Sequence, residues 1–262
     1  MSLAERAAAL LVPKPFQEFL PYVSPSALRV VHKDKVLGLA LEIAARTVKS
    51  PSTEDWKPIE LAFRASGSKI RIDSQSGTGF KSISEGDRTR AGELLLELYF
   101  HLIHQPTPLE LDLRPTHFSF HSVEKTLVWN PSRLRHIRTP EFQSRVIDLY
   151  RGFFFDDAKA AARGLELYRW ETTPKPGYDE RMEKLLRIHF GDARSKPVLF
   201  EISHFKETFH LIFEEAIESR TRFHPELTFL GTTLTGLYMS LEQLAVPLDV
   251  RAAYLRATGG QS

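Results

Sequence analysis

The chain has 262 residues, 42% of them hydrophobic and 26% charged, a composition typical of folded globular proteins with one or two domains. The 35 Lys and Arg residues nearly balance the 33 Asp and Glu residues, so the net charge is +2 and no strong field would attract nucleic acid or an anionic membrane. There is no cysteine, which excludes disulfides, thiolate catalysis and cysteine-bound metal, and which agrees with a reducing compartment.

The beginning of the chain carries no recognisable targeting signal. Residues 1–12 lack the basic start and the long apolar run of a signal peptide. No segment has enough uninterrupted apolar residues to span a bilayer. We therefore expect a cytoplasmic protein without a transmembrane segment.

The first third of the chain has the less regular pattern. Apolar residues at helical spacing predict a helix over residues 35–48, followed by a loop over residues 50–58. Alternating apolar residues then predict two short antiparallel strands, over residues 59–63 and 70–72. Residues 74–79 are rich in turn formers and end this part.

From Asp87 onward, helical periodicity dominates the sequence. Leu94, Leu98 and Leu102 recur at helical spacing after Asp87, which is a natural N-cap, and Pro106 ends this helix. The other predicted elements are a hairpin over residues 117–129, a helix that begins at Pro140, and helices over residues 156–168, 178–190, 204–219 and 228–244. The fold class is therefore mainly α.

The last of these helices has the clearest pattern. Leu230, Leu234, Leu237 and Leu241 follow one face, which predicts that this stripe is buried. Two glycines interrupt the same helix, at positions 231 and 236, and each weakens it. We expect both glycines to mark close contacts with another element.

Four stretches, taken in chain order, resemble those of a known family. Residues 69–80 end in a glycine turn, and residues 88–104 form the helix that follows. Residues 111–120 read LDLRPTHFSF, and residues 225–251 contain the leucine-rich helix. In these stretches the chain resembles the C-terminal lobe of the ABC1/UbiB family of atypical kinase-like proteins, which is associated with ubiquinone and prenyl-lipid metabolism.

The resemblance implies a kinase-like fold, with residues 1–82 as a reduced or rebuilt N-terminal α+β portion and residues 83–262 as the helical C-lobe. It places Asp112 where the family has its catalytic aspartate, and His117 where the family has a metal-binding asparagine. Asn130 falls at the position of the aspartate that holds magnesium. The family's Lys-x-Gly-Gln motif and its alanine-rich nucleotide loop are absent.

These replacements bear directly on catalysis. Phosphoryl transfer needs a carboxylate to place the metal, and the neutral amide of Asn130 supplies only one weak oxygen ligand. We therefore expect a pseudokinase that binds a partner protein, a lipid-like molecule or a nucleotide, with any ATP bound without strong dependence on magnesium. Two alternatives stay open. One is an active kinase or ATPase with Asp112 as the base and Asp148, Asp156 or Asp157 as the metal ligand, and the other is an unrelated helical interaction protein.

Two other groups of side chains have the chemistry of a site. Glu97, His101 and His104 lie on adjoining turns of one predicted helix, but no fourth ligand is evident and an apolar stripe passes beside the histidines. Ser119 has histidines two positions away on either side and Asp112 nearby, yet no nucleophile-elbow pattern surrounds it. A structural role is favoured for both groups.

The remaining motifs favour structural roles as well. The glycines of residues 74–79 lack the lysine of a P-loop and predict a turn. The phenylalanines of residues 153–155 favour the core, or the wall of an apolar pocket if the link to prenyl lipids carries over. A run of cations is predicted to form a solvated face rather than a site for an anionic partner; its members are Arg133, Arg135, His136 and Arg138.

Overall fold

The computed structural model describes residues 19, 26–47, 53–73, 79–191 and 193–260, and these residues are mainly helical, as predicted. The helices are α3 (Ala27–Val30), α4 (Lys33–Thr47), α5 (Lys57–Ser66), α6 (Glu85–His104), α7 (Pro140–Phe155), α8 (Ala158–Leu165), α9 (Tyr178–Phe190), α10 (Ile202–Glu218), α11 (Leu227–Leu244) and α12 (Val250–Thr258). The strands are β1 (Ile70–Ile72), β2 (Leu109–Glu110), β3 (Phe118–His121), β4 (Thr126–Trp129) and β5 (Arg135–His136).

The strands form two small sheets on one side of the molecule. β3 and β4 pair antiparallel, which confirms the predicted hairpin, and β1 joins β4 in parallel to give the order β1-β4-β3. β2 and β5 form a separate antiparallel pair. The loop between β2 and β3 therefore begins in one sheet and ends in the other.

The strand predicted over residues 59–63 is wrong, because these residues belong to α5. Pro58 occupies an early helical position, where its missing N–H costs nothing, and Gly67 ends the helix with a left-handed φ of 69°. Ile59 and Phe63 are both buried, whereas Leu61 between them is 58% exposed. Three alternating apolar residues also fit one turn of an amphipathic helix, so the pattern was ambiguous.

The prediction of a loop over residues 50–58 is also wrong for residues 53–58. A single helical turn, η2 (Thr53–Trp56), leads directly into α5 there. Residues 50–52, the first twelve residues and all but the last residue of the turn predicted at 74–79 lie outside the described part. The other predicted helices agree with α4 and α6 to α11 within a few residues. Helix α12 was not predicted, although Asp249 caps it by accepting from the Ala252 N–H at 2.8 Å.

Ser84, rather than Asp87, is the N-cap residue of α6. Asp87 lies in the first turn, where its carboxylate accepts from the hydroxyl of Ser84 at 2.9 Å and pairs with Lys125 at 2.5 Å. An acidic side chain in the first turn is favoured by the helix dipole, so both positions suit a helix start. The prediction misplaced the N-cap by three residues.

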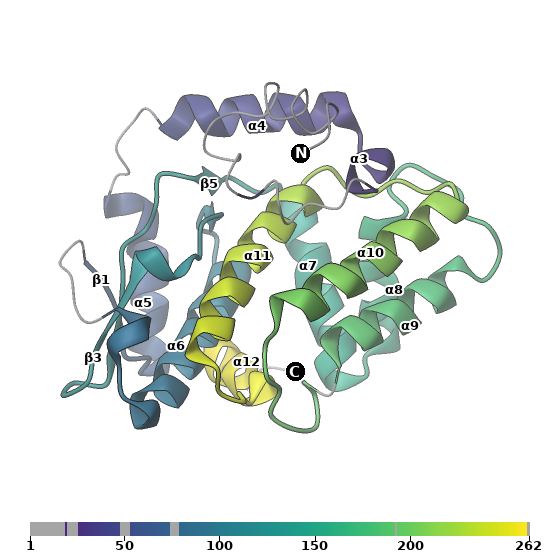
Figure 1. The fold of residues 1–262 in the computed structure, drawn as a ribbon. Helices are drawn as coiled ribbons and strands as arrows, with labels where there is room; N and C mark the ends of the chain where they lie inside the picture. The colour runs from purple at the N-terminus through teal and green to yellow at the C-terminus, as the bar shows by residue number, and fades with distance from the viewer. Residues whose placement is uncertain (1–18, 20–25, 48–52, 74–78, 192, 261–262) are drawn as a thin grey trace.

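The core is built around α6 and α11. Figure 1 shows the strands and α5 on one side of these two helices, α7 to α10 on the other, and α4 across one end of the molecule. Leu237 and Leu241 on the predicted stripe of α11 are buried, as is Leu230, while Leu234 is half-buried at the edge of a cavity. No helix in the described part of the chain combines the length and apolar character needed to cross a membrane.

Candidate functional site

The candidate site lies on the loop between β2 and β3, and α11 holds this loop from one side. Thr233 on α11 donates a hydrogen bond to the carbonyl oxygen of Glu110 at 2.9 Å. One and two turns farther on, Gly236 approaches the loop backbone, and Ser240 donates to the carbonyl oxygen of Leu113 at 2.6 Å. These contacts satisfy buried carbonyl groups and bind the loop to the core.

The loop brings three side chains together, which we call the Asp112 cluster: Asp112, Arg114 and His117. The Asp112 carboxylate is buried, with 4% of the residue exposed. It accepts two hydrogen bonds from the Arg114 guanidinium, from Nε at 2.8 Å and from Nη2 at 2.6 Å. The Nε2 atom of His117 lies 3.1 Å from Oδ2 of the same carboxylate. Asp112 is therefore held by two cationic partners.

Asn130 meets the cluster through its backbone. Its carbonyl oxygen lies 3.1 Å from Nδ1 of His117, and its N–H donates to the His117 carbonyl oxygen at 2.9 Å. A carbonyl oxygen only accepts, so Nδ1 of His117 carries a proton. Burial lowers the pKa of His117, but the hydrogen bond and charge of Asp112 outweigh it, and the net shift is upward. The side chain of Asn130 is exposed, and only its backbone takes part.

Glu110 adjoins the cluster and was not predicted. It is completely buried, and Oε1 accepts from the Asp112 N–H at 3.1 Å and from the Ser132 hydroxyl at 2.5 Å. Oε2 has no hydrogen-bond partner among the described residues. Burial raises the pKa of Glu110 to about 7, which leaves this carboxyl partly protonated near neutral pH. In the sequence, Glu110 alternates with leucines in the same way as Asp112 and Arg114, and this pattern could have indicated that Glu110 lies near them.

The geometry of His117 prevents this histidine from acting as the base of a serine triad. A serine triad needs one ring nitrogen directed at the carboxylate and the other at the hydroxyl. Here one nitrogen faces Asp112 and the other faces the carbonyl of Asn130, so neither is available to Ser119. Ser119 is itself buried on β3.

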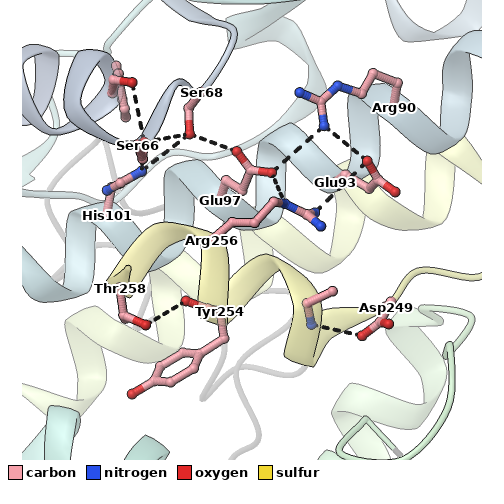
Figure 2. Close-up of polar contacts among 12 residues, drawn as sticks. Ser66, Ser68, Arg90, Glu93, Glu97, His101, Asp249, Tyr254, Arg256 and Thr258 are labelled. Carbon is pink, nitrogen blue, oxygen red and sulfur yellow. Dashed lines mark hydrogen bonds and ion pairs between the residues drawn. The ribbon is translucent and has the colours of Figure 1, made fainter. Parts of the chain in front are cut away.

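Glu97, the candidate metal ligand on α6 that carries a charge, is engaged in a network of ion pairs (Figure 2). Glu97 accepts from Arg256 of α12 at 2.5 Å and from the hydroxyl of Ser68 at 2.7 Å. His101 points toward the serines at the end of α5, and burial lowers the pKa of both His101 and His104 to about 4. No group of three or more His, Cys, Asp or Glu side chains in the described part of the chain is arranged to hold a metal ion.

The four cationic residues after the hairpin were predicted to form a solvated face. This prediction is wrong for three of them, which bind acceptors within the fold. Arg135 pairs with Asp55, and His136 is buried with Nε2 2.7 Å from the Glu226 carboxylate. Arg138 donates to three carbonyl oxygens at the end of α6: that of Ile103 in its last turn, and those of Gln105 and Thr107 just beyond it. Only Arg133 is exposed as predicted. These cations satisfy acceptors of the fold itself.

The other aspartates proposed as metal ligands also have structural partners. Asp148 makes a two-point ion pair with Arg163, both distances being 2.7 Å. Asp156 pairs with Arg194, and Asp157 caps α8 by accepting from the Ala160 N–H. Within the described part of the chain, no ion pair or hydrogen bond joins these aspartates to a member of the Asp112 cluster.

Two sizeable cavities lie elsewhere in the fold. One, of about 340 Å³, is bordered mainly by apolar residues of α10 and α11. The other, of about 390 Å³, lies between α6, α7, α9 and α11. Neither cavity is lined by Asp112, His117 or Asn130. Phe153 and Phe154 are buried, as expected for core residues, and Phe154 also lines the larger cavity.

Comparison with known proteins assigns no family to this chain. No family model matches the sequence, and no match was found among the curated proteins.

Proposed function

We propose that this protein is a pseudokinase of the ABC1/UbiB type, which binds a partner protein, a lipid-like molecule or a nucleotide without efficient phosphoryl transfer. The observation that carries the proposal is the double engagement of Asp112 by Arg114 and His117. A kinase base accepts the proton of the acceptor hydroxyl, and it needs a free carboxylate oxygen to do so. In this chain both oxygens of that carboxylate are hydrogen-bonded to cationic partners.

The order of the elements supports the kinase-like part of the proposal. Kinases carry an aspartate and, five residues later, an asparagine on the loop after a helix, and a metal-binding aspartate beyond the next pair of strands. Here Asp112 and His117 have the same spacing after α6, and Asn130 follows the β3–β4 hairpin. A division of the chain near residue 82 is part of the same proposal.

The electrostatics of the cluster support the non-catalytic part. Magnesium needs anionic oxygen ligands, and the two positions that would supply metal ligands carry His117 and Asn130. A metal ion at Asp112 would have to displace the Arg114 guanidinium, which makes a two-point hydrogen bond. An active kinase that uses Asp112 as its base, the runner-up, requires this pair to open. The absence of cysteine from the sequence agrees with a cytoplasmic site of action.

Nucleotide binding and turnover by the purified protein test the proposal. We expect no magnesium-dependent ATP hydrolysis or transfer above background, and any affinity for ATP measured by calorimetry should be the same in magnesium and in EDTA. Clear magnesium-dependent turnover would overturn the proposal.

Restoring the metal ligands provides the sharper test. The double variant His117→Asn with Asn130→Asp replaces both altered positions and removes one cationic partner of Asp112. If these are the metal positions, nucleotide binding should become dependent on magnesium. The matched control is His121→Asn with Val123→Asp on the same hairpin, where Val123 is 98% exposed. An equal response of both double variants would argue against a metal position at Asn130.

A further inference from the structure

The larger cavity, of about 390 Å³, has the features of a small-molecule site. It lies between α6, α7, α9 and α11, and its wall is completed by Ala193 and residues 196–201, by His204 of α10 and by Val250 of α12. Its volume is in the range of pockets that bind small ligands. The inference drawn from it does not depend on the proposed function, since no member of the Asp112 cluster lines this cavity.

His189 presents a hydrogen-bond acceptor in this cavity. The hydroxyl of Thr208 donates its single proton to the carbonyl oxygen of His204 at 2.7 Å. The same hydroxyl lies 2.8 Å from Nδ1 of His189, so it accepts from that nitrogen, and Nδ1 carries a proton. Burial lowers the pKa of His189 to about 3, which keeps the ring neutral. Nε2 is therefore an unprotonated acceptor, and no described residue donates to it.

Tyrosine hydroxyls supply donors to the same cavity. Tyr99 and Tyr150 both line it, and their hydroxyls hydrogen-bond each other. Only one of the two protons is used in that bond, so the other has no acceptor among the described residues. Tyr238 also lines the cavity, with its ring 6.0 Å from that of His189, and burial raises its pKa well above the usual range, so its hydroxyl keeps its proton.

The rest of the lining restricts the body of the ligand. Most of the wall is aromatic or aliphatic, from residues that include Phe100, Phe190 and Leu237. Lys196 and Glu201 are exposed and therefore belong to the mouth of the cavity. His204 also lines the cavity and is half-buried, and its Nε2 lies 3.2 Å from the carbonyl oxygen of His189. A charged ligand group in the interior would lose its hydration without gaining a counter-ion there. The interior therefore suits a neutral, mainly apolar molecule.

We infer that this cavity binds a small, neutral, mainly apolar molecule through a hydroxyl group, which donates to Nε2 of His189 and accepts from a tyrosine hydroxyl. A hydroxyl is the simplest ligand group that both donates and accepts, so it complements the histidine and the tyrosines at once. Alcohols and phenols belong to this class. The apolar body of such a ligand removes the aromatic wall from water.

Three probes of nearly equal shape test the inference with the full chain: para-cresol, its methyl ether and para-xylene. Their binding is followed by the NMR methyl signals of Leu237 and Val250, which line the cavity. The ether keeps the oxygen but cannot donate, and the xylene neither donates nor accepts. We expect para-cresol to bind at least about tenfold more tightly than either analogue, because only the phenol satisfies the histidine. Equal affinities, or no shift of these signals at millimolar probe, would overturn the inference.

Two variants assign the selectivity to the named groups. His189→Phe keeps an aromatic ring and removes the acceptor, so it should abolish the preference for para-cresol and leave the affinity for para-xylene within about twofold. Tyr238→Phe removes a single oxygen and should weaken para-cresol by about threefold or more. Thermal unfolding checks that each variant is folded, and Tyr254→Phe is the control, since Tyr254 is buried outside the cavity lining. A full preference for para-cresol in folded His189→Phe or in Tyr238→Phe would contradict the assignment.

Discussion

Gly236 lies directly against the backbone of Leu113. A Cβ atom at Gly236 would stand 2.8 Å from the Leu113 nitrogen and 3.1 Å from the nitrogen of Arg114, closer than side chains normally approach. The predicted close contact is therefore confirmed at this glycine. It is wrong for Gly231, one turn and a half earlier on α11, where a Cβ would meet nothing within 4 Å.

This difference yields a matched pair of substitutions. Gly236→Ala must push α11 away from the loop that carries Asp112, and we expect it to destabilise the protein by about 1–3 kcal/mol, as overpacked sites do. Gly231→Ala meets open space and should instead stabilise the helix by about 0.5–1 kcal/mol. Urea unfolding of both variants measures the two effects. Equal effects of the two substitutions would show that the close approach at Gly236 has no energetic consequence.

The apolar stripe of α11 is tested by truncating Leu237, which is 2% exposed. Leu237→Ala removes buried methyl groups and should lower the free energy of unfolding by about 2–5 kcal/mol. Leu211→Ala on α10 is the control, because Leu211 is 46% exposed and should change stability by less than about 0.5 kcal/mol. Chemical denaturation compares the two. A loss below about 0.5 kcal/mol for Leu237→Ala would mean that the stripe does not contribute to the core.

The half-buried guanidinium of Arg138 is expected to stabilise the end of α6. It donates to the carbonyl oxygens of Ile103, Gln105 and Thr107, and Gln143 also donates to the first two. Arg138→Gln should cost about 1–3 kcal/mol, because the carbonyl of the buried Thr107 loses its donor. Arg133→Gln makes the same change on an exposed side chain of the same cationic run and should be within about 0.5 kcal/mol of the wild type. Thermal melts at matched ionic strength measure the difference, and equal melting temperatures of the two variants would contradict a capping role.

Glu110 predicts a specific dependence of stability on pH. Its pKa is raised from 4.5 to about 7 in the folded state, so the folded protein binds this proton more tightly than the unfolded chain. The contribution of this proton is fully present below about pH 4.5 and is lost as the pH rises through about 7, a total of roughly 3 kcal/mol.

Removing the titrating group checks this sign. The stability of Glu110→Gln should not fall in this way, because glutamine does not titrate. The free energy of unfolding of the variant minus that of the wild type should therefore rise between about pH 5 and pH 8. Glu141→Gln changes an exposed glutamate at the start of α7 and should keep the wild-type profile. Denaturant unfolding across this pH range measures both, and a constant difference between Glu110→Gln and wild type would refute the raised pKa.

Residues close together in the sequence account for most of what could be predicted. The helical stripe of α11, the start of α7 at Pro140 and the β3–β4 hairpin all follow from spacings within one element. The same local patterns misassigned α5, because three alternating apolar residues satisfy a strand and a helical turn equally well. Position in the chain also brought Asn130 to His117, since only the β3–β4 hairpin separates them, although Asn130 takes part through its backbone and not its side chain.

Contacts between distant residues could not be predicted, and they decide what the site can do. No local pattern indicates that Glu97 pairs with Arg256, 159 residues away, or that His136 binds Glu226, 90 residues away. The partners of a buried charge depend on which elements pack together, because the charge is stable only beside the group that compensates it. The sequence by itself determined α4, the helices α6 to α11, the hairpin and the candidate aspartate of this protein. Only the tertiary structure decided that Asp112 is bound by Arg114 and His117, because α11 holds the loop that carries all three residues. It also decided that a cavity opens beside His189, since this depends on how the helices pack.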